Sequence, residues 1–214
     1  MLHWSTLGDK QKAVLKMIIG QNPVPGSYLA GGTALALILG HRLSIDFDWF
    51  CASKFDTETL SHQLSDIGSF KISEAAQGTL HGFFEGVRIS WLYYPNPMLD
   101  EFVTTLEMPG LKLASTLDIA VMKLVALSHR GSVKDFIDLY LLAHNSLAPG
   151  QLINELPRKF PQAKLNYYHI IKSLSYFDDA ECEPMPKMLI ELDWQDLKRF
   201  FLEEQKELLA NMNQ

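Results

Sequence analysis

The sequence lacks several features that would assign it to a specialised class of protein. It has only two cysteines, Cys51 and Cys182, far apart and without a CxxC partner. A structural zinc site is therefore not expected, and two free thiols fit a reducing cytoplasm. No apolar run approaches the roughly 20 residues that span a bilayer, and the first residues do not resemble a signal peptide. We therefore expect a soluble, cytoplasmic protein with no membrane partner.

An excess of basic residues is also absent. Lys and Arg number 19 against 25 Asp and Glu, which gives a formal net charge of -6 and a pI near 5.6. A basic nucleic-acid-binding surface over the whole chain is therefore not expected, although a local basic patch is compatible with these numbers. The 47% of hydrophobic and 21% of charged residues are typical of a globular protein. No internal repeat is evident.

Hydrophobic periodicity divides the chain into a mixed half and a helical half. In the first, we predict helices over 8–20, 33–39 and 56–67, strands over 28–30 and 44–50, and β-prone pieces at 71–73, 78–85 and 87–94 with a hairpin turn at Glu85-Gly86. From residue 115 on, we predict helices over 119–127, 135–142 and 194–211, a broken stretch over 149–165 and an acidic loop over 178–186. The predicted fold class is α+β, with a mixed sheet, flanking helices and a helical C-terminal region.

Two carboxylates stand two residues apart in the predicted strand over 44–50. Alternation places Asp46 and Asp48 on one face, while Ile45, Phe47 and Trp49 anchor the other in the core. Neighbouring carboxylates repel each other unless a cation compensates them, and hard oxygen ligands suit Mg²⁺. The alternative is that both carboxylates belong to a solvated face.

A pair of glycines precedes the predicted helix that begins at Thr33. Gly31 and Gly32 permit a tight turn and a close approach of the backbone. A helix that starts after such a turn offers N–H groups and the positive end of its dipole to a phosphate. Glycine pairs are also common in ordinary turns. The combination of this turn with the two carboxylates is typical of a site that handles a nucleoside triphosphate.

Five segments together resemble the AbiEii/AbiGii-type abortive-infection nucleotidyltransferases, which belong to the polymerase-β-like superfamily. The resemblance covers about residues 25–145. The segments that carry it are Gly31-Gly32-Thr33-Ala34-Leu35-Ala36-Leu37, Gly40-His41-Arg42-x-Ser44-x-Asp46-x-Asp48-x-Phe50, Leu113-Ala114-Ser115 with Asp118-Ile119-Ala120-x-Met122-Lys123, Arg130-Gly131, and Lys134-Asp135-Phe136-Ile137-Asp138-Leu139-Tyr140.

The resemblance implies Mg²⁺- or Mn²⁺-dependent transfer of a nucleoside monophosphate from an NTP to RNA, such as a tRNA 3′ end, or to a protein. It also implies a toxin role in a toxin–antitoxin or phage-defence pair, with an antitoxin encoded nearby. Residues 1–112 would form the nucleotidyltransferase core, and residues 113–214 would complete the nucleotide cleft.

The resemblance also assigns roles to individual residues. The metal ligands would be Asp46 and Asp48, and Asp138, less surely Asp135, would be the downstream acidic residue. The nucleotide would be bound by Gly31, Gly32, Thr33, Arg42, Ser44, Lys123 and Lys134. The catalytic residues would be Asp46, Asp48, Lys123 and Asp138.

Lys123, Arg130 and Lys134 would share a face if one continuous helix carried them. That basic stripe would suit phosphates, but Gly131 can break the register. Lys134 and Asp138, four residues apart, can alternatively form only a local ion pair. Lys123 in an apolar helix can also simply extend to water.

Ser90 departs from the pattern that the resemblance implies. Superfamily members often have a third carboxylate on the later strand, and serine is neither an anionic ligand nor a good proton acceptor near neutral pH. Asp135 or Asp138 could replace it. The alternatives to an active enzyme are a non-catalytic nucleotide-binding module that retains the fold and a structural domain that binds a partner through the helix over 194–211.

Overall fold

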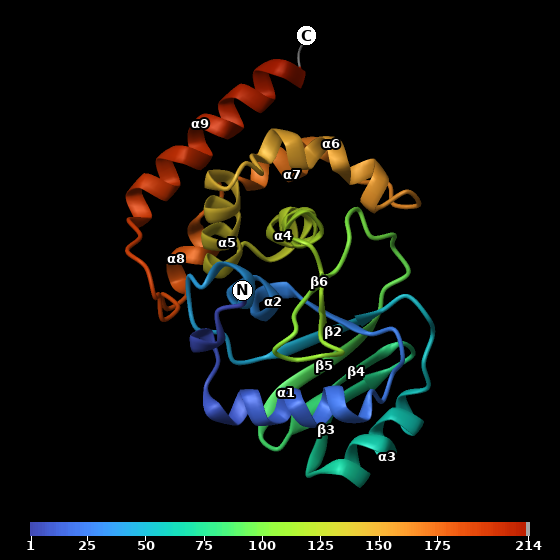
Figure 1. Ribbon diagram of the computed structural model, residues 1–214. Coiled ribbons are helices and arrows are strands. Elements are labelled where there is room, and N and C mark those ends of the chain that lie inside the picture. Colours follow the sequence, from blue (N-terminus) through green and yellow to red (C-terminus); the bar gives the residue numbers. More distant parts are fainter. Residues whose placement is uncertain (213–214) are drawn as a thin grey trace. The chain divides into compact units, whose positions relative to one another are not determined.

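The computed structural model describes residues 1–212, which divide into two compact units (Figure 1). The first unit comprises residues 1–97 and 101–115, and the second comprises residues 98–100 together with the chain from 116 onward. Residues 113–115, which the sequence placed in the helical region, therefore belong to the first unit. Each unit is described by itself.

The first unit is built on a seven-stranded mixed sheet with the order β3-β4-β5-β2-β1-β7-β6. Strand β2 runs parallel to β5, and β1 runs parallel to β7, whereas the other neighbours are antiparallel. The strands are β1 (Tyr28–Ala30), β2 (Phe47–Cys51), β3 (Phe70–Ala76), β4 (Thr79–Phe84), β5 (Val87–Tyr93), β6 (Val103–Thr104) and β7 (Lys112–Leu113). The predicted mixed sheet is confirmed.

A two-residue turn joins β4 to β5 and sets their register. Glu85 and Gly86 both have positive φ, +50° and +70°, as expected for a turn that follows the twist of a hairpin. Phe84 therefore pairs with Val87, and the pairing continues strand-long from there. The predicted turn is confirmed, and it fixes which side chains meet across the two strands.

Three α-helices and a short 3-10 helix flank this sheet, and Figure 1 shows α1 and α3 on one side and α2 on the other. Their bounds are η1 (Trp4–Thr6), α1 (Asp9–Gln21), α2 (Gly31–Leu39) and α3 (Thr57–Ile67). The Asp56 side chain caps α3 by accepting a hydrogen bond from the Thr59 N–H at 2.7 Å. Gly40, in the left-handed conformation, ends α2 as predicted.

Aromatic residues form much of the core of the first unit. The rings of Trp49 in β2 and Trp91 in β5 are stacked with centroids 5.6 Å apart, and both side chains are buried. Phe47 and Phe84 are fully buried as well. The core face of β2 is therefore the face that carries Phe47 and Trp49, and Asp48 lies on the opposite face.

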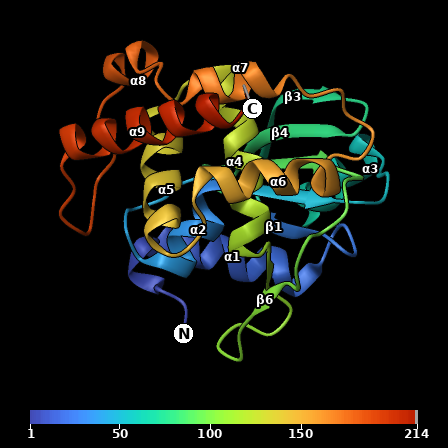
Figure 2. The same ribbon diagram turned by 90° about the horizontal axis from the view of Figure 1, so that it is seen from above.

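The second unit is built of helices joined by loops, as predicted, and α4 is its central helix. It packs against α5, α6 and α7, and α9 contacts α5, α6 and α7 (Figure 2). The helices are α4 (Thr116–Arg130), α5 (Val133–His144), α6 (Pro149–Lys159), α7 (Tyr167–Ser173), α8 (Asp178–Cys182) and α9 (Trp194–Met212). Part of the predicted acidic loop over 178–186 is thus the short helix α8. Within residues 1–212, every helix is too short or too polar to span a bilayer.

Candidate functional site

The first residue of α2 lies directly beside the Asp48 carboxylate. Gly31 has a φ of +66°, a left-handed value that costs a residue with a side chain about 1–2 kcal/mol. A Cβ atom at this position would also lie only 3.1 Å from Oδ2 of Asp48. Glycine therefore lets this carboxylate approach the N–H groups that have no partner within the helix.

The predicted start of this helix at Thr33 is wrong by two residues. Gly31 and Gly32 form the first turn of α2, and Ala30 is its N-cap. Because β1 ends at Ala30, the chain passes from strand to helix without a loop. The backbone N–H groups predicted to hold phosphates thus belong to the helix itself, and their binding of phosphates stays a prediction.

The Thr33 side chain ties α2 to the segment that precedes β2. Thr33 is buried, its Oγ1 donates a hydrogen bond to the backbone carbonyl of Asp46, and it lies 2.7 Å from Oγ of Ser44. A hydroxyl has one proton, so Ser44 is the donor in the second contact. In this structure Thr33 and Ser44 position the Asp46 segment, whereas their predicted contact with a nucleotide is untested.

Arg42 brings a positive charge to the same end of α2. Its side chain is buried, and Nη1 donates to the carbonyl of Leu43 at 3.3 Å. A Cβ atom at Gly32 would lie 2.5 Å from Nη2 of Arg42. The guanidinium therefore packs against the glycine backbone, where it adds to the positive potential of the helix N-terminus.

The predicted strand over 44–50 begins only at Phe47. Ile45, expected in the core, has 60% of its surface exposed, whereas Phe47 and Trp49 are buried as predicted. Asp46 precedes the strand and Asp48 lies within it, so alternation does not place these two carboxylates on one face. The physical reason is the Thr33 hydrogen bond, which takes the Asp46 carbonyl.

The residue types at this position are those that a magnesium ion prefers. Asp46 and Asp48 supply hard carboxylate oxygens, and both side chains are partly exposed. Among the side chains of residues 1–212, no group of three or more His, Cys, Asp and Glu is placed to hold a metal. Mg²⁺ commonly takes one or two carboxylates and completes its octahedron with phosphate and water oxygens, so two protein ligands suffice.

Ser90 lies in register with Asp48, and His81 lies in register with Ser90. Nδ1 of His81 is 2.9 Å from Oγ of Ser90, a side-chain hydrogen bond across the β4–β5 pair. Ser90 is buried, and His81 is partly exposed. His81 was not among the predicted site residues, although the two-residue turn at Glu85-Gly86 already implied that it would pair with Ser90.

In the second unit, Lys123 lies between two buried carboxylates. Its Nζ is 2.8 Å from Oδ1 of Asp135 and 2.7 Å from Oδ2 of Asp138, and both aspartates are fully buried. Arg130 donates two hydrogen bonds to Asp135, from Nε at 2.7 Å and from Nη2 at 3.0 Å. The predicted catalytic pair of Lys123 and Asp138 is thus a buried ion pair, and its role in catalysis stays a prediction.

The charges around Asp135 favour its ionised form. Burial alone would raise the pKa of this carboxyl, but the positive charges and hydrogen bonds of Lys123 and Arg130 outweigh burial and hold the pKa below its usual value.

The predicted basic stripe is wrong. Gly131, with a φ of +55°, separates α4 from α5, so no continuous helix carries the three cations. Lys123 is buried, whereas Lys134 is exposed on α5. The nucleotide-binding role predicted for Lys134 is untested.

A second buried ion pair joins α4 to α6. Nζ of Lys159 is 2.6 Å from Oδ1 of Asp118, and neither side chain has any exposed surface. The Asp118 carboxylate also accepts hydrogen bonds from the N–H groups of Leu99 at 2.9 Å and Asp100 at 3.2 Å. This cluster was not predicted, because its partners lie up to 41 residues apart in sequence.

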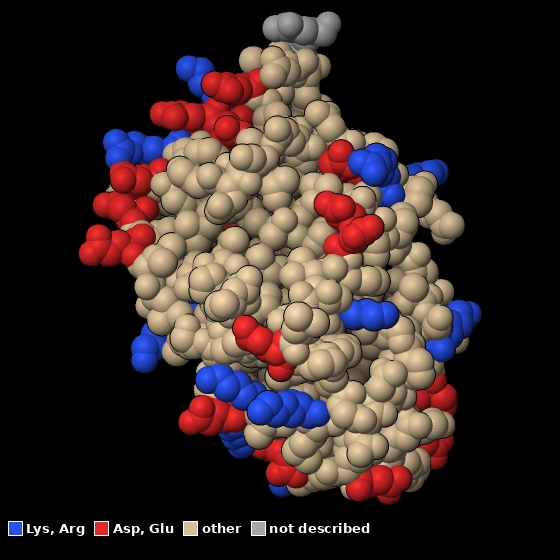
Figure 3. Space-filling view, in the orientation of Figure 1, with Lys and Arg blue, Asp and Glu red and all other residues tan. Residues whose placement is uncertain are grey.

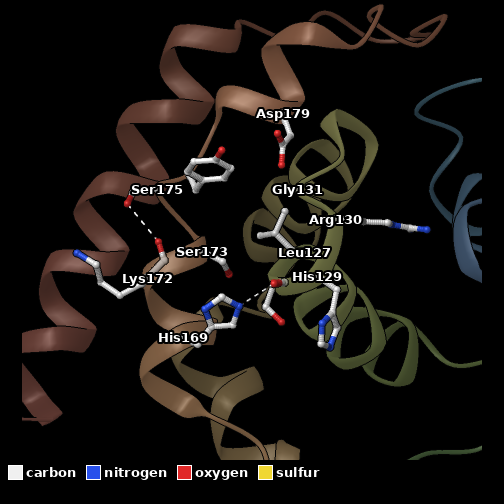
Figure 4. Close-up of a pocket in the computed structure, with 11 residues that line it drawn as sticks. Leu127, His129, Arg130, Gly131, His169, Lys172, Ser173, Ser175 and Asp179 are labelled. Carbon is white, nitrogen blue, oxygen red and sulfur yellow. Dashed lines mark hydrogen bonds between the residues drawn. The ribbon is translucent and has the colours of Figure 1, made fainter.

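The second unit also contains a hollow of about 480 Å³ at the junction of α4, α7 and α8 (Figure 4). Figure 4 shows the charged ends of Arg130 and Lys172 pointing away from it. His169 is held by a contact of 2.9 Å between its Nε2 and the carbonyl of Ser128. Arg130, a member of the predicted basic stripe, lines this hollow, whereas the predicted metal ligands and nucleotide-binding residues do not.

Comparison with known families gives a match over most of the chain. The family model described as nucleotidyl transferase AbiEii toxin, Type IV TA system, matches residues 25–211. An uncharacterized protein of Aquifex aeolicus strain VF5 is 34% identical over 209 residues, which are 96% of this chain and 98% of that protein.

Solved structures share the fold at low identity. JHP933 from Helicobacter pylori has a TM-score of 0.58 and 16% identity, with 97% of each chain covered. MenT4, the nucleotidyltransferase toxin Rv2826c from Mycobacterium tuberculosis H37Rv, has a TM-score of 0.56 and 13% identity, with 92% of this chain and 81% of that chain covered. These likenesses confirm the predicted type of mixed sheet followed by a helical region.

Proposed function

Because the chain belongs to the AbiEii nucleotidyltransferase toxin family, we propose that it transfers a nucleoside monophosphate from an NTP to an acceptor with the help of Mg²⁺ or Mn²⁺. The observation that carries this proposal is the position of the Asp48 carboxylate against Gly31, at the start of α2. A carboxylate suited to a metal ion and a helix N-terminus meet at one place, where each would contact a different part of a metal-bound triphosphate.

Different residues around Gly31 would bind different parts of the triphosphate. The N–H groups at the start of α2 and the Arg42 guanidinium would hold phosphate oxygens, and Thr33 with Ser44 would keep the Asp46 segment in place. A metal ion held by Asp46 and Asp48 would supply charge neutralisation at the phosphates. Together, these groups would orient the α-phosphate beside Asp48 for attack by an acceptor hydroxyl.

The acceptor proposed here is an RNA hydroxyl, such as that of a tRNA 3′ end, with a protein hydroxyl as the alternative. The toxin would act within a toxin–antitoxin or phage-defence pair, and the family's type IV description supports an antitoxin partner. On the face shown in Figure 3, basic side chains are scattered among acidic ones and do not merge into a continuous stripe. Because the formal net charge of the chain is -6, we expect recognition of a local RNA feature, with weak binding of nucleic acid in general.

The proposal is tested by incubating the protein with each labelled NTP, Mg²⁺ and total RNA. We expect a labelled RNA or protein product that requires Mg²⁺. Asp46→Asn and Asp48→Asn should each abolish the product and weaken Mg²⁺-dependent NTP binding, because each removes one anionic oxygen ligand. Asp66→Asn, a change at an exposed position of α3, is the matched control and should leave both unchanged.

Two outcomes would contradict the proposal in different ways. Unchanged Mg²⁺-dependent NTP binding in both site variants would refute the assignment of the metal ligands. Tight binding without any product, across RNA and protein acceptors, would instead favour a nucleotide-binding module without catalysis, which Ser90 in place of a third carboxylate motivates.

A further inference from the structure

A row of polar side chains crosses the sheet beside Asp48. Register pairs join Asp48 in β2 to Ser90 in β5, Ser90 to His81 in β4, and His81 to Glu74 in β3. Residues directly opposite each other on neighbouring strands point to the same face, and neighbouring strands lie about 4.8 Å apart. Ser90 is therefore the neighbour of Asp48 in β5, and His81 lies one strand further along the row, on the face opposite the buried tryptophans.

The two sides of Asp48 differ in chemistry. On the β1 side, its Oδ2 lies against Gly31, where the N-terminus of α2 provides positive potential for phosphates. On the β5 side lies the hydrogen-bonded pair of Ser90 and His81. A phosphate bound at the helix end would thus have the Ser90–His81 pair on the other side of Asp48.

The β5 side needs a proton acceptor if the reaction is nucleotidyl transfer. An attacking hydroxyl must lose its proton as it bonds to phosphorus, and serine alone is a poor base. Imidazole is the side chain best suited to accept a proton near neutral pH. Ser90 is buried and His81 is partly exposed, so the pair connects the floor of the site to a group that can release a proton to water.

We propose that the Ser90–His81 pair accepts the proton of the acceptor hydroxyl during nucleotidyl transfer. This inference rests on the proposed function. The acceptor O–H proton passes to Oγ of Ser90 while the Ser90 proton passes to Nδ1 of His81, so that His81 becomes an imidazolium. The acceptor oxygen bonds to the α-phosphorus, the bond from that phosphorus to the bridging oxygen breaks, and pyrophosphate leaves with the electron pair.

The tautomer of His81 follows from this assignment. Nδ1 must accept from Ser90 in the resting state, so the ring carries its proton on Nε2. Glu74, beside His81 in β3, is an exposed carboxylate that can balance the imidazolium charge. His81 acts on the acceptor through Ser90 and is therefore a positioning and relay residue, whereas Ser90 contacts the acceptor.

The test separates proton transfer from packing. His81→Asn keeps an amide oxygen near the position of Nδ1, so it can still accept from Ser90 but cannot take up the proton. We expect this variant, and Ser90→Ala, to lower kcat about 100-fold or more while the KM for NTP and the thermal unfolding midpoint stay near those of the unaltered protein. His62→Gln, at an exposed histidine of α3, is the control and should transfer at the full rate.

A rescue variant makes the test specific to the proton. Ser90→Asp combined with His81→Asn places a carboxylate beside Asp48 that can accept the proton directly. The kcat of this double variant should be at least about tenfold higher than the kcat of His81→Asn alone. Full activity of His81→Asn would overturn this inference alone. So would a loss of activity that is accompanied by an equal loss of NTP binding and of thermal stability and that Ser90→Asp does not rescue. Absence of any transfer by the unaltered protein would overturn the proposed function together with it.

Discussion

Two buried lysines of the helical unit hold buried carboxylates. Lys123 bonds to both Asp135 and Asp138, whereas Lys159 bonds to Asp118. Removing the cation from such a site takes away compensation of buried negative charge, which is the costly way to break an ion pair.

Lys123→Met and Lys159→Met should therefore each lower the free energy of unfolding by about 3–5 kcal/mol. Lys134→Met, at an exposed position of α5, is the control and should change it by less than about 0.5 kcal/mol. Urea unfolding followed by tryptophan fluorescence measures all three.

The same variants separate structure from function. If Lys123 also contacts the triphosphate, its variant should lose NTP binding at temperatures where the protein is still folded, whereas the Lys159 variant should retain it. Equal retention of NTP binding by both would show that Lys123 serves only the fold.

Asp135 should make stability depend on acidity. Its pKa is held below the usual value in the folded protein, so below about pH 4 the unfolded chain binds a proton that the folded chain does not. The stability from this group is present above that pH and is lost as the pH falls through the lowered pKa. As the pH is lowered from about 5 to about 3, the free energy of unfolding should fall less steeply for Asp135→Asn than for the unaltered protein. Equal slopes would contradict the prediction.

At the scale of elements, the start of α2 and the last turn of α1 should respond in opposite ways to the change of glycine to alanine. Gly31→Ala should destabilise the protein by about 1–2 kcal/mol because of its left-handed φ. The new Cβ would also press on the Asp48 carboxylate, so Mg²⁺-dependent NTP binding should weaken.

Gly20→Ala in α1 is the matched control, because a Cβ there meets no atom within 4 Å. It should stabilise the protein by about 0.5–1 kcal/mol and leave NTP binding unchanged. Thermal unfolding with and without Mg²⁺ and NTP measures both variants, and a Gly31→Ala protein with full stability and binding would contradict the account of the site.

Local patterns predicted those elements whose signals lie close together in sequence. The end of the helix over 33–39 before Gly40 and the Glu85-Gly86 turn were each identified from a few residues, and both are confirmed. The family assignment is confirmed as well, and it rested on motifs spread over more than 100 residues.

The remaining features depend on distant partners. The start of β2 was misplaced because Thr33, 13 residues away, takes the Asp46 carbonyl. The burial of Lys123 follows from the break at Gly131, which folds α5 back so that Asp135 and Asp138 both reach it. Periodicity within one helix contains no information about either contact.

His81 is an intermediate case. The predicted two-residue turn implied its pairing with Ser90, since pairing Phe84 with Val87 leads along the strands to this pair. What the turn could not predict is the parallel pairing of β5 with β2, which places Ser90 beside Asp48. Parallel neighbours are joined by long crossovers and leave no local signal.

At the scale of the whole molecule, the chain passes between its two units three times, after residues 97, 100 and 115. The short return of residues 98–100 is held by Asp118, which accepts the N–H groups of Leu99 and Asp100.

This return limits how the gene can be shuffled in evolution or in the laboratory. A single recombination junction at 115/116 would combine Leu99 and Asp100 from one parent with Asp118 from another. The buried cluster around Asp118 would then contain residues that come from two different proteins. Faithful inheritance of the helical unit as a module requires residues 98–100 to travel with it. Chimaeras that exchange both pieces should therefore fold more often than chimaeras made by one cut.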